Sequence, residues 1–238
     1  MTDPLFLAQP YLRDCPATVT GLTPEGGIIL DRSIFYPTGG GQPGDSGQLV
    51  WTGGSIDIAT TVKGEEGAQF LVAAEPVALP AVGASVMQHL DWERRHRHMR
   101  VHTALHLLSV VIPLPVTGGA IAADKGRLDF DMPESPGDPE DIAAQVNALI
   151  ARDLSVTDEW ITEAAFDANP GLVKTLSVKP PRGAGTIRLV RIADAISLVD
   201  LQPCGGTHVA RTSEIGRVTM GRIEKKGRQN RRVTLLLT

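Results

Sequence analysis

Residues 94–111 read Arg-Arg-His-Arg-His-Met-Arg-Val-His-Thr-Ala-Leu-His-Leu-Leu-Ser-Val-Val, and the interpretation of the chain starts from this stretch. If the stretch is helical, His102 and His106 lie one turn apart on the same face, where both imidazoles can reach one metal ion. The apolar residues around them would bury the helix and exclude water. A pair of histidines alone is a weak signal, because many helices carry two.

A second pair of donor residues lies much further along the chain. Cys204 and His208 belong to the segment Cys-Gly-Gly-Thr-His. Together with His102 and His106 they supply three imidazoles and one thiolate, which is a complete tetrahedral set for one zinc ion. Four protein ligands are typical of a structural zinc, and no His-Glu-x-x-His supplies a glutamate base. Two alternatives stay open: one ligand gives way to water, or the zinc organises the pocket and orients the substrate.

The distribution of charge is more informative than its sum. The chain has 238 residues, enough for one large domain or two small ones, and a net charge of −4 that by itself does not suggest nucleic-acid binding. Residues 94–100 hold four arginines, two histidines and no acid, and residues 217–232 hold seven basic residues against one acid. Either cluster is a solvated surface or a phosphate-binding face. The candidate phosphate-binding residues are Arg100, Lys225, Lys226 and Arg231, and His96 and His98 are expected to face solvent or phosphate.

The N-terminus and the cysteines indicate the compartment. The first residues lack a basic region and a long apolar run, so neither a signal peptide nor a membrane span is expected. Only two cysteines are present, Cys15 and Cys204, and a disulfide framework is therefore not expected. A reduced, cytoplasmic setting follows, and it suits an unoxidised thiolate ligand.

Hydrophobic patterning divides the chain near residue 90. Residues 1–90 contain short strand-like runs separated by turns and no convincing helical period, which predicts a small β-barrel or sandwich. Residues 91–238 mix helix and strand patterns and predict an α+β domain, in which Asp138 caps a helix over residues 138–153. The predicted strands cover residues 17–22, 27–36, 55–63, 69–73, 85–90, 127–131, 186–193, 195–201, 216–224 and 232–237, and residues 156–165 are either strand or mixed.

A glycine-rich segment interrupts the strands of the first part. Residues 36–47 read Tyr-Pro-Thr-Gly-Gly-Gly-Gln-Pro-Gly-Asp-Ser-Gly. Gly39, Gly40 and Gly41 permit backbone conformations closed to other residues and let a ligand come close. Gln42 is the long polar side chain that this loop carries. The alternative interpretation is a flexible hairpin connection with no further role.

These motifs carry a resemblance to a known family. Residues 102–108 and 204–209 resemble the two zinc motifs of the alanyl-tRNA synthetase editing domain and of its free-standing relatives, the AlaX proteins. Residues 36–47 resemble the glycine-rich motif of that family, and residues 127–130 and 226–232 also match its pattern. The resemblance runs from about residue 15 to the end. No aminoacylation domain is recognisable, so the chain looks like a free-standing editor of the medium-sized class.

The resemblance implies both a fold and a reaction. It implies an elongation-factor-like β-barrel over residues 1–90 and, over residues 91–238, an α+β editing domain of the threonyl/alanyl-tRNA synthetase type. The implied reaction is hydrolysis of the ester that joins a wrong amino acid, serine or glycine, to the 3′ end of alanine tRNA. The family often has Gly-Ser after the histidine motif, whereas this chain has Gly119-Ala120, so the fine amino-acid preference stays open.

We therefore expect one zinc ion held by His102, His106, Cys204 and His208, with mischarged tRNA as the partner. Gln42 and the amides of residues 39–41 are expected to close over the amino acid or the terminal adenosine, with Thr207 as a second polar group near the metal. Two alternatives remain: a zinc-stabilised RNA-binding module without hydrolysis, and an editor of another mischarged tRNA, such as the threonine acceptor charged with serine. Replacing Gln42 would separate the binding module from the editor, because only the editor would lose rate.

Overall fold

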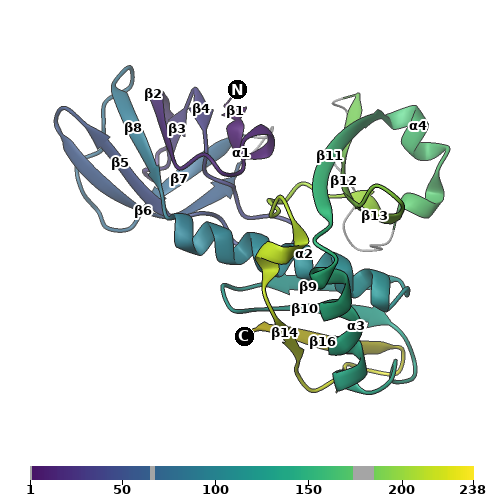
Figure 1. Cartoon of the computed structure of the whole chain (residues 1–238). Helices are drawn as coiled ribbons and strands as arrows, with labels where there is room; N and C mark the ends of the chain where they lie inside the picture. Colours follow the sequence, from purple (N-terminus) through teal and green to yellow (C-terminus); the bar gives the residue numbers. More distant parts are fainter. Residues whose placement is uncertain (1, 65–67, 174–184) are drawn as a thin grey trace. The chain divides into compact units, whose positions relative to one another are not determined.

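The computed structural model describes residues 2–64, 68–173 and 185–238 of the chain (Figure 1). The chain divides into two compact units, Met1–His96 and Arg97–Thr238. The division falls inside α2 (Trp92–Val111), so this helix begins in the first unit and ends in the second. No helix of the described ranges is both long and apolar enough to cross a membrane.

The first unit contains the small β-barrel that the patterning predicts. In the described part of this unit, six strands close into a barrel in the order β2–β3–β7–β6–β5–β8. Alternating side chains of β2, such as Cys15, Ala17 and Val19, point into the barrel core, as the two-residue period of a strand requires. The elements of this unit are β1 (Asp3–Pro4), α1 (Leu5–Ala8), β2 (Asp14–Leu22), β3 (Ile28–Leu30), β4 (Arg32–Ser33), β5 (Gly47–Trp51), β6 (Gly54–Lys63), β7 (Gln69–Ala73) and β8 (Ser85–Leu90).

Two details of the barrel differ from the prediction. The single strand predicted over residues 27–36 is wrong, because the chain forms β3, then the short β4, and then leaves the ladder. Ile34, Phe35 and Tyr36 are all buried in succession, so they do not alternate between two faces as strand residues do. Strand β5 was not predicted, and it follows the glycine-rich segment directly.

The second unit is α+β, as predicted. Its described residues form a sheet in the order β14–β16–β10–β9, to which β15 adds beside β16, and a three-stranded sheet β11–β12–β13. After α2 the elements are β9 (Val116–Ile121), β10 (Lys125–Asp131), α3 (Pro139–Ala151), β11 (Ser155–Thr162), α4 (Glu163–Asp167), the 3₁₀ turn Pro170–Leu172, β12 (Thr186–Ala193), β13 (Leu198–Pro203), the 3₁₀ turn Thr212–Ile215, β14 (Val218–Met220), β15 (Glu224–Lys225) and β16 (Asn230–Leu237).

Turn chemistry explains where this unit departs from the predicted strands. The strand predicted from residue 195 begins only at Leu198, because the Asp194 carboxylate accepts hydrogen bonds from the amides of Ile196 and Ser197 and closes a turn. The strand predicted over residues 216–224 is divided into β14 and β15. Strand β9 was missed, because Gly118 and Gly119 weaken its pattern.

Helices α2 and α3 form for different reasons. Helix α3 is amphipathic and begins as predicted: Asp138 accepts a hydrogen bond of 2.8 Å from the amide of Glu140. Residues 101–109 of α2 are instead buried on all sides. Gly126 of β10 lets α2 come close to the sheet, because a Cβ there would lie 2.5 Å from Cγ1 of Val101. The buried helix is therefore held at a fixed distance from β10.

Candidate metal centre

The second unit brings together the four donor residues that the sequence predicted. Nitrogens of His102, His106 and His208 and the sulfur of Cys204 all lie within 4.8 Å of one another. The sulfur lies 3.4 Å from Nε2 of His102 and 3.3 Å from Nε2 of His208. Four donor atoms converging on one point in this way could hold one metal ion.

Burial of the donors is uneven. His102, His106 and His208 are 5–7% exposed, whereas Cys204 is half-buried. A buried imidazole is held in one orientation by its surroundings, so these three rings lose little freedom on binding an ion.

A buried carboxylate sets the orientation of His106. Oδ2 of Asp200 lies 2.9 Å from Nδ1 of His106 and accepts a second hydrogen bond, of 2.8 Å, from Nε2 of Gln202. Asp200 is 2% exposed. A carboxylate can only accept here, so Nδ1 of His106 carries the proton and Nε2 keeps its lone pair for a metal.

A threonine hydroxyl sets the tautomer of His208 in the same way. Oγ1 of Thr103 donates to the carbonyl of Met99 over 2.9 Å and lies 3.1 Å from Nδ1 of His208. Because its one proton goes to Met99, the hydroxyl must accept from His208. His208 therefore carries its proton on Nδ1 and presents the lone pair of Nε2 to the sulfur side of the site.

Arg188 of β12 holds the loop that carries Cys204 and His208. Its Nη1 donates to the carbonyls of Cys204, over 2.9 Å, and Gly206, over 3.0 Å. The guanidinium also lies 3.4 Å from the carboxylate of Asp158. The amide of Gly206 donates to the Cys204 sulfur over 3.4 Å. The loop conformation is thus determined by one buried arginine and by the thiolate itself.

The protonation states suit a metal site. Burial acts to raise the pKa of Cys204, but the imidazoles of His102 and His208 outweigh it and hold that pKa well below its ordinary value. Burial, followed by the charge of His102, lowers the pKa of His208 to about 3. Burial acts to lower the pKa of His106, but the hydrogen bonds to Asp200 and Cys204, together with the charges of both groups, outweigh it and raise that pKa to about 9. At neutral pH the thiolate and neutral His208 are ready to bind, whereas His106 must first release a proton.

Sequence reasoning missed the residues that support the donors. Asp200, Gln202 and Cys204 are spaced by two, so in β13 and its continuation they point to one side. That alternation was the available signal for Asp200. Thr103 carried no such signal, because a threonine beside a histidine in a buried helix is unremarkable until its partner, His208, is known.

Replacing Asp200 with alanine is expected to weaken metal binding by about 10–100-fold, because His106 loses the acceptor that orients it. Isothermal titration of the metal-free protein measures this change. Asp57→Ala is the matched control, because Asp57 is a carboxylate that also accepts from a glutamine side chain, Gln48, but lies in β6 of the barrel in the first unit. An unchanged metal affinity in the Asp200 variant would contradict this role.

The glycine-rich segment of the first unit forms a tight turn. The amide of Gly39 donates to the carbonyl of Gln42 and the amide of Gln42 donates to the carbonyl of Gly39, over 3.0 and 2.9 Å. Gly40 and Gly41 between them have φ of 56° and 82°, which only glycine adopts without strain. The Gly39 amide is used inside the turn, so the amides of Gly40 and Gly41 are the ones open to a ligand. The side chain of Gln42 is fully buried.

The basic cluster of residues 94–100 is not a uniform phosphate-binding face. Arg95 is fully buried, and its Nε donates to the Asp45 carboxylate over 2.8 Å. The expectation that His98 faces solvent or phosphate is wrong as well, since His98 is 2% exposed. His96 is half-buried and stacks on Trp92, with ring centroids 5.2 Å apart. The sequence showed the charges but not which side of the helix is covered.

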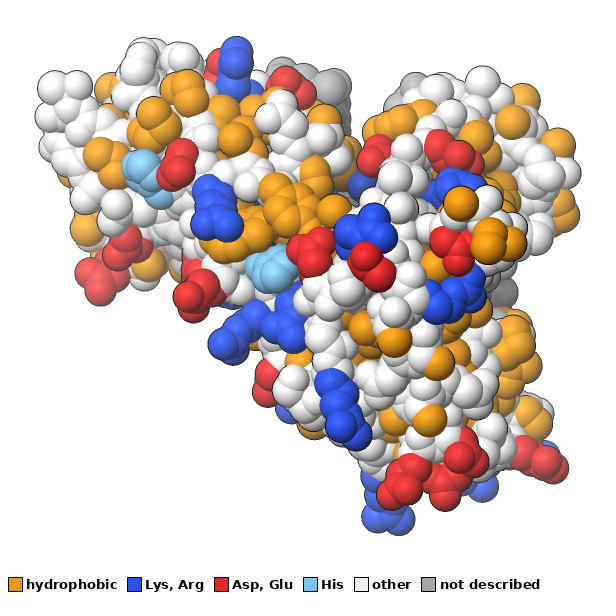
Figure 2. Space-filling model, viewed as in Figure 1, with side chains coloured by type: hydrophobic (Ala, Val, Ile, Leu, Met, Phe, Trp, Pro, Cys, Tyr) orange, Lys and Arg blue, Asp and Glu red, His pale blue; other side chains and the backbone are white. Residues whose placement is uncertain are grey.

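The remaining candidate residues lie in varied surroundings. Arg100 donates to the carbonyl of Ile215 over 2.9 and 2.7 Å. Lys225 and Lys226 are exposed, and Lys226 pairs with Glu224. Arg231 bonds the carbonyl of Pro133, and Thr207 is buried in the loop between Cys204 and His208. Figure 2 shows basic side chains spread over the visible face with acidic side chains among them, and no single large basic patch.

Comparison with known proteins agrees with this site. Residues 187–234 match the family described as "Threonyl and Alanyl tRNA synthetase second additional domain", a range that includes Cys204 and His208. Residues 16–94 match "tRNA synthetases class II (A)". The two matches together cover most of the barrel and the second metal motif.

Whole-length relatives extend the match. The chain is 32% identical to the alanyl-tRNA editing protein AlaX-M of Methanosarcina mazei, with 98% of this chain and 95% of the relative covered. It is 33% identical to AlaX-M of Methanosarcina barkeri, with 100% and 99% covered. It is 30% identical to an alanine–tRNA ligase of Pyrobaculum arsenaticum, of which it covers 25%. The class defined by this site is a domain shared with tRNA synthetases, and in this chain it contains four donor residues that could hold a metal ion. The chain belongs to the family of alanyl-tRNA editing proteins.

Proposed function

We propose that the protein is an aminoacyl-tRNA deacylase that removes a wrong amino acid from alanine tRNA. The observation that carries the proposal is the convergence of His102, His106, Cys204 and His208 on one point. Membership of the alanyl-tRNA editing family supports the choice of substrate, because the relatives' names state that role. Serine and glycine are the amino acids proposed, as esters of the 3′ end of the tRNA.

Zinc is the metal proposed for the site. Three imidazoles and one thiolate are the donors that zinc prefers. A zinc ion held by these four residues would supply Lewis-acid chemistry for hydrolysis of the ester. The chain's own residues do the rest: Asp200 and Thr103 aim the imidazoles, and Arg188 holds the loop that carries Cys204.

Substrate selection is proposed to depend on polar groups that fit a serine side chain. A site that hydrogen-bonds the serine hydroxyl rejects alanine strongly, because alanine would leave that polar group unpaired. Thr207 is the candidate beside the metal ligands. Gln42 and the amides of Gly40 and Gly41 are the candidates from the glycine-rich loop. At position 120 this chain has alanine where the family often has serine, so a hydroxyl that the family often supplies is missing. We propose that this loss affects the preference of the protein between serine and glycine.

The finer fold assignments are part of the same proposal. We assign residues 1–90 to an elongation-factor-like barrel domain and residues 91–238 to the editing domain. The closed barrel supports the first assignment, and the match of residues 187–234 supports the second. We also propose that the protein works in the cytoplasm, since a reducing compartment keeps Cys204 as a thiolate.

Deacylation of three charged tRNAs tests the function. Alanine tRNA carrying serine, glycine or alanine is incubated with the protein, with and without a chelator. Loss of serine or glycine that needs the metal, with alanine spared, would establish the editor. Metal binding and tRNA binding without hydrolysis of any ester would instead establish the RNA-binding module, which the complete set of four protein ligands favours. Faster hydrolysis of serine from the threonine acceptor would identify the other editor.

Salt is expected to weaken tRNA binding, because Arg100, Lys225, Lys226 and Arg231 are proposed to neutralise tRNA phosphates. For each phosphate that the protein neutralises, a tenfold rise in salt lowers the logarithm of the association constant by about 0.7–0.9. Filter binding of alanine tRNA between 50 and 300 mM salt measures the slope, with chloride and acetate compared as a control for anion effects. An affinity that does not change with salt would exclude the electrostatic assignment. Arg95 contributes nothing to this slope, because it is buried and paired.

A further inference from the structure

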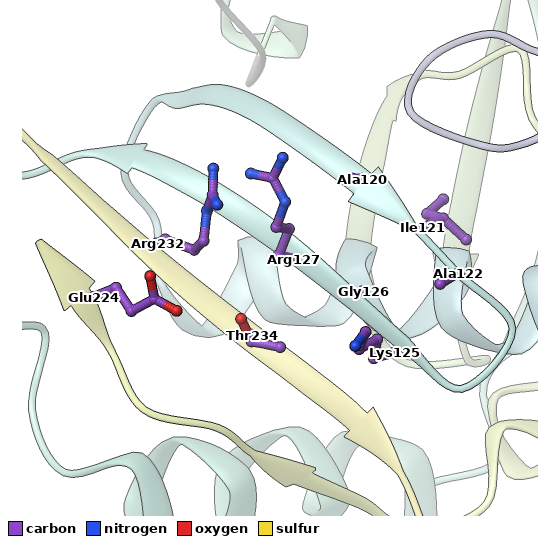
Figure 3. A pocket seen from close by; sticks show the side chains of 9 residues that line it. All are labelled: Ala120, Ile121, Ala122, Lys125, Gly126, Arg127, Glu224, Arg232 and Thr234. Carbon is purple, nitrogen blue, oxygen red and sulfur yellow. The ribbon is translucent and has the colours of Figure 1, made fainter. Parts of the chain in front are cut away.

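A hollow of about 370 Å³ lies on the sheet of the second unit, and none of the four metal ligands lines it (Figure 3). Its cationic lining residues are Lys125, Arg127 and Arg232. The other residues that line it are Ala120, Ile121, Ala122, Gly126, Glu224 and Thr234. Figure 3 shows the side chains of Arg127 and Arg232 rising next to each other from β10 and β16.

Strand register explains why these cations share one face. Along β10, Gly126 and Leu128 are buried and Gly126 meets helix α2, so the alternate residues Arg127 and Asp129 point to the opposite side. Arg232 lies directly opposite Asp129 on β16. Arg127, Asp129 and Arg232 therefore stand together on the outer face of the sheet.

Small residues of β9 keep the space above them open. In the register of β9 and β10, Ala120 lies opposite Arg127 and Gly118 lies opposite Asp129. Neither residue has a side chain long enough to cover the two guanidinium groups. Ala120 and Gly118 thus leave the space above the two guanidinium groups open.

One carboxylate holds both arginines in place. Asp129 accepts from Nη1 of Arg127 over 2.7 Å, and from Nε and Nη2 of Arg232 over 2.7 and 2.9 Å. Nε and Nη2 of Arg127 and Nη1 of Arg232 make no hydrogen bond to any described residue. The side chains of Arg127 and Arg232 remain 34% and 25% exposed. Three groups of N–H donors are therefore pre-oriented and still open to a ligand, which lowers the entropy lost on binding.

The charge of the hollow selects an anion. Three cations line it against one acid, Glu224, which lies 2.8 Å from Nζ of Lys226 and is offset by it. Asp129 cancels one of the arginine charges and leaves a net positive site. Planar guanidinium groups with paired N–H donors match the oxygens of a phosphate, and the hydroxyl of Thr234 adds a neutral donor.

We propose that this hollow binds a backbone phosphate of the tRNA, as a contact separate from the metal centre. The proposal rests on the proposed function for the identity of the ligand. A phosphate bound between Arg127 and Arg232 positions the tRNA without reading its sequence. It holds the tRNA while the aminoacyl end is at the metal ligands.

The test compares a whole tRNA with a substrate that has no backbone phosphate. The full-length double variant Arg127→Gln, Arg232→Gln is assayed with seryl-tRNA and with 3′-seryl-adenosine. We expect tRNA affinity to fall by about tenfold or more and the salt slope to fall by about one to two. Hydrolysis of the adenosine ester should not change. The variant Arg127→Lys, Arg232→Lys should keep most of the salt slope and recover only part of the affinity. Lysine retains the positive charge but lacks the planar pair of N–H donors with which a guanidinium binds two phosphate oxygens.

Two controls separate phosphate binding from damage to the fold. Arg152→Gln removes an arginine that also pairs with a carboxylate, Asp194, but does not line the hollow, and it should leave tRNA affinity unchanged. Asp129→Asn removes the carboxylate and leaves both cations, so it should not reduce the salt slope.

Each outcome decides one question. Unchanged tRNA affinity and slope in the glutamine double variant would overturn the phosphate site. So would an equal loss of activity on the adenosine ester, because that loss would be structural. If the wild-type protein hydrolyses no charged tRNA while the double variant still loses affinity and slope, the phosphate site stands and the proposed deacylase function fails.

Discussion

Replacing Cys204 with alanine is expected to remove the bound metal and to lower hydrolysis of mischarged tRNA by more than about a hundred-fold. Loss of a residue that only hydrogen-bonds a metal ligand already lowers metal affinity or activity by about 10–100-fold. Cys204 is itself a donor, so its loss should have a larger effect. Its sulfur lies within 3.4 Å of a nitrogen of both His102 and His208, so the variant loses the donor around which the imidazoles gather. The thiolate is also the one anionic donor of the group.

Metal content and single-turnover deacylation measure the two effects separately. Cys15→Ala is the matched control, because Cys15 is the other cysteine and is buried in the barrel core of the first unit. Cys15→Ala should keep one metal ion per chain and the full rate. A Cys204 variant that keeps the metal but loses the rate would show that the thiolate acts in the reaction and not in holding the ion. A variant that keeps both would contradict the proposed site.

Replacing Asp45 with alanine is expected to lower the free energy of unfolding of the first unit by about 3–5 kcal/mol, because it leaves the Arg95 charge buried and unpaired. Oδ2 of Asp45 accepts from Nε of Arg95 over 2.8 Å and from the amide of Tyr36 over 2.6 Å. The exposed fractions of the Arg95 and Asp45 side chains are 0% and 1%. Water therefore cannot replace the lost partner.

Urea denaturation followed by the fluorescence of Trp51 and Trp92 measures this change, since both tryptophans pack against the barrel core. Glu224→Ala is the contrasting control: it removes the exposed pair with Lys226 and should change the free energy of unfolding far less, because water solvates both charges. The double variant Asp45→Ala, Arg95→Met should be more stable than Asp45→Ala alone, because it no longer buries a charge. If the double variant is instead the less stable of the two, the buried charge is not the cause.

The same ion pair carries a structural consequence for the glycine-rich loop. Asp45 lies in that loop, and Arg95 lies in the first turn of α2, the helix that later carries His102 and His106. Arg94 adds a hydrogen bond of 2.8 Å to the carbonyl of Gly44. A Cβ at position 44 would lie 2.0 Å from the carbonyl oxygen of Thr61, so only glycine fits there. The ends of the loop are thus held, while Gly40 at its tip has open space around it.

Local patterns in the sequence predicted most of the elements. The two-residue alternation of β2, β6 and β8 and the capped amphipathic face of α3 depend on near neighbours, so they are visible in the order of residues. The strand predicted over residues 186–193 has the same bounds as β12. The four donors were also visible, because imidazole and thiol side chains at those spacings favour one kind of chemistry.

Only the tertiary structure decided which polar residues matter. Arg94, Arg95 and Arg97 look alike in the sequence, yet Arg95 is buried because Asp45, fifty positions earlier, lies beside it. Asp200 acquires its role from His106, and the hollow beside Arg127 and Arg232 exists because Ala120 and Gly118, opposite Arg127 and Asp129 on β9, are too small to cover it. Near neighbours along the chain determine helix and strand, whereas burial and charge pairing depend on residues that meet only after folding. The sequence therefore predicted most of the elements and the four donors of this protein, and its fold decided their partners.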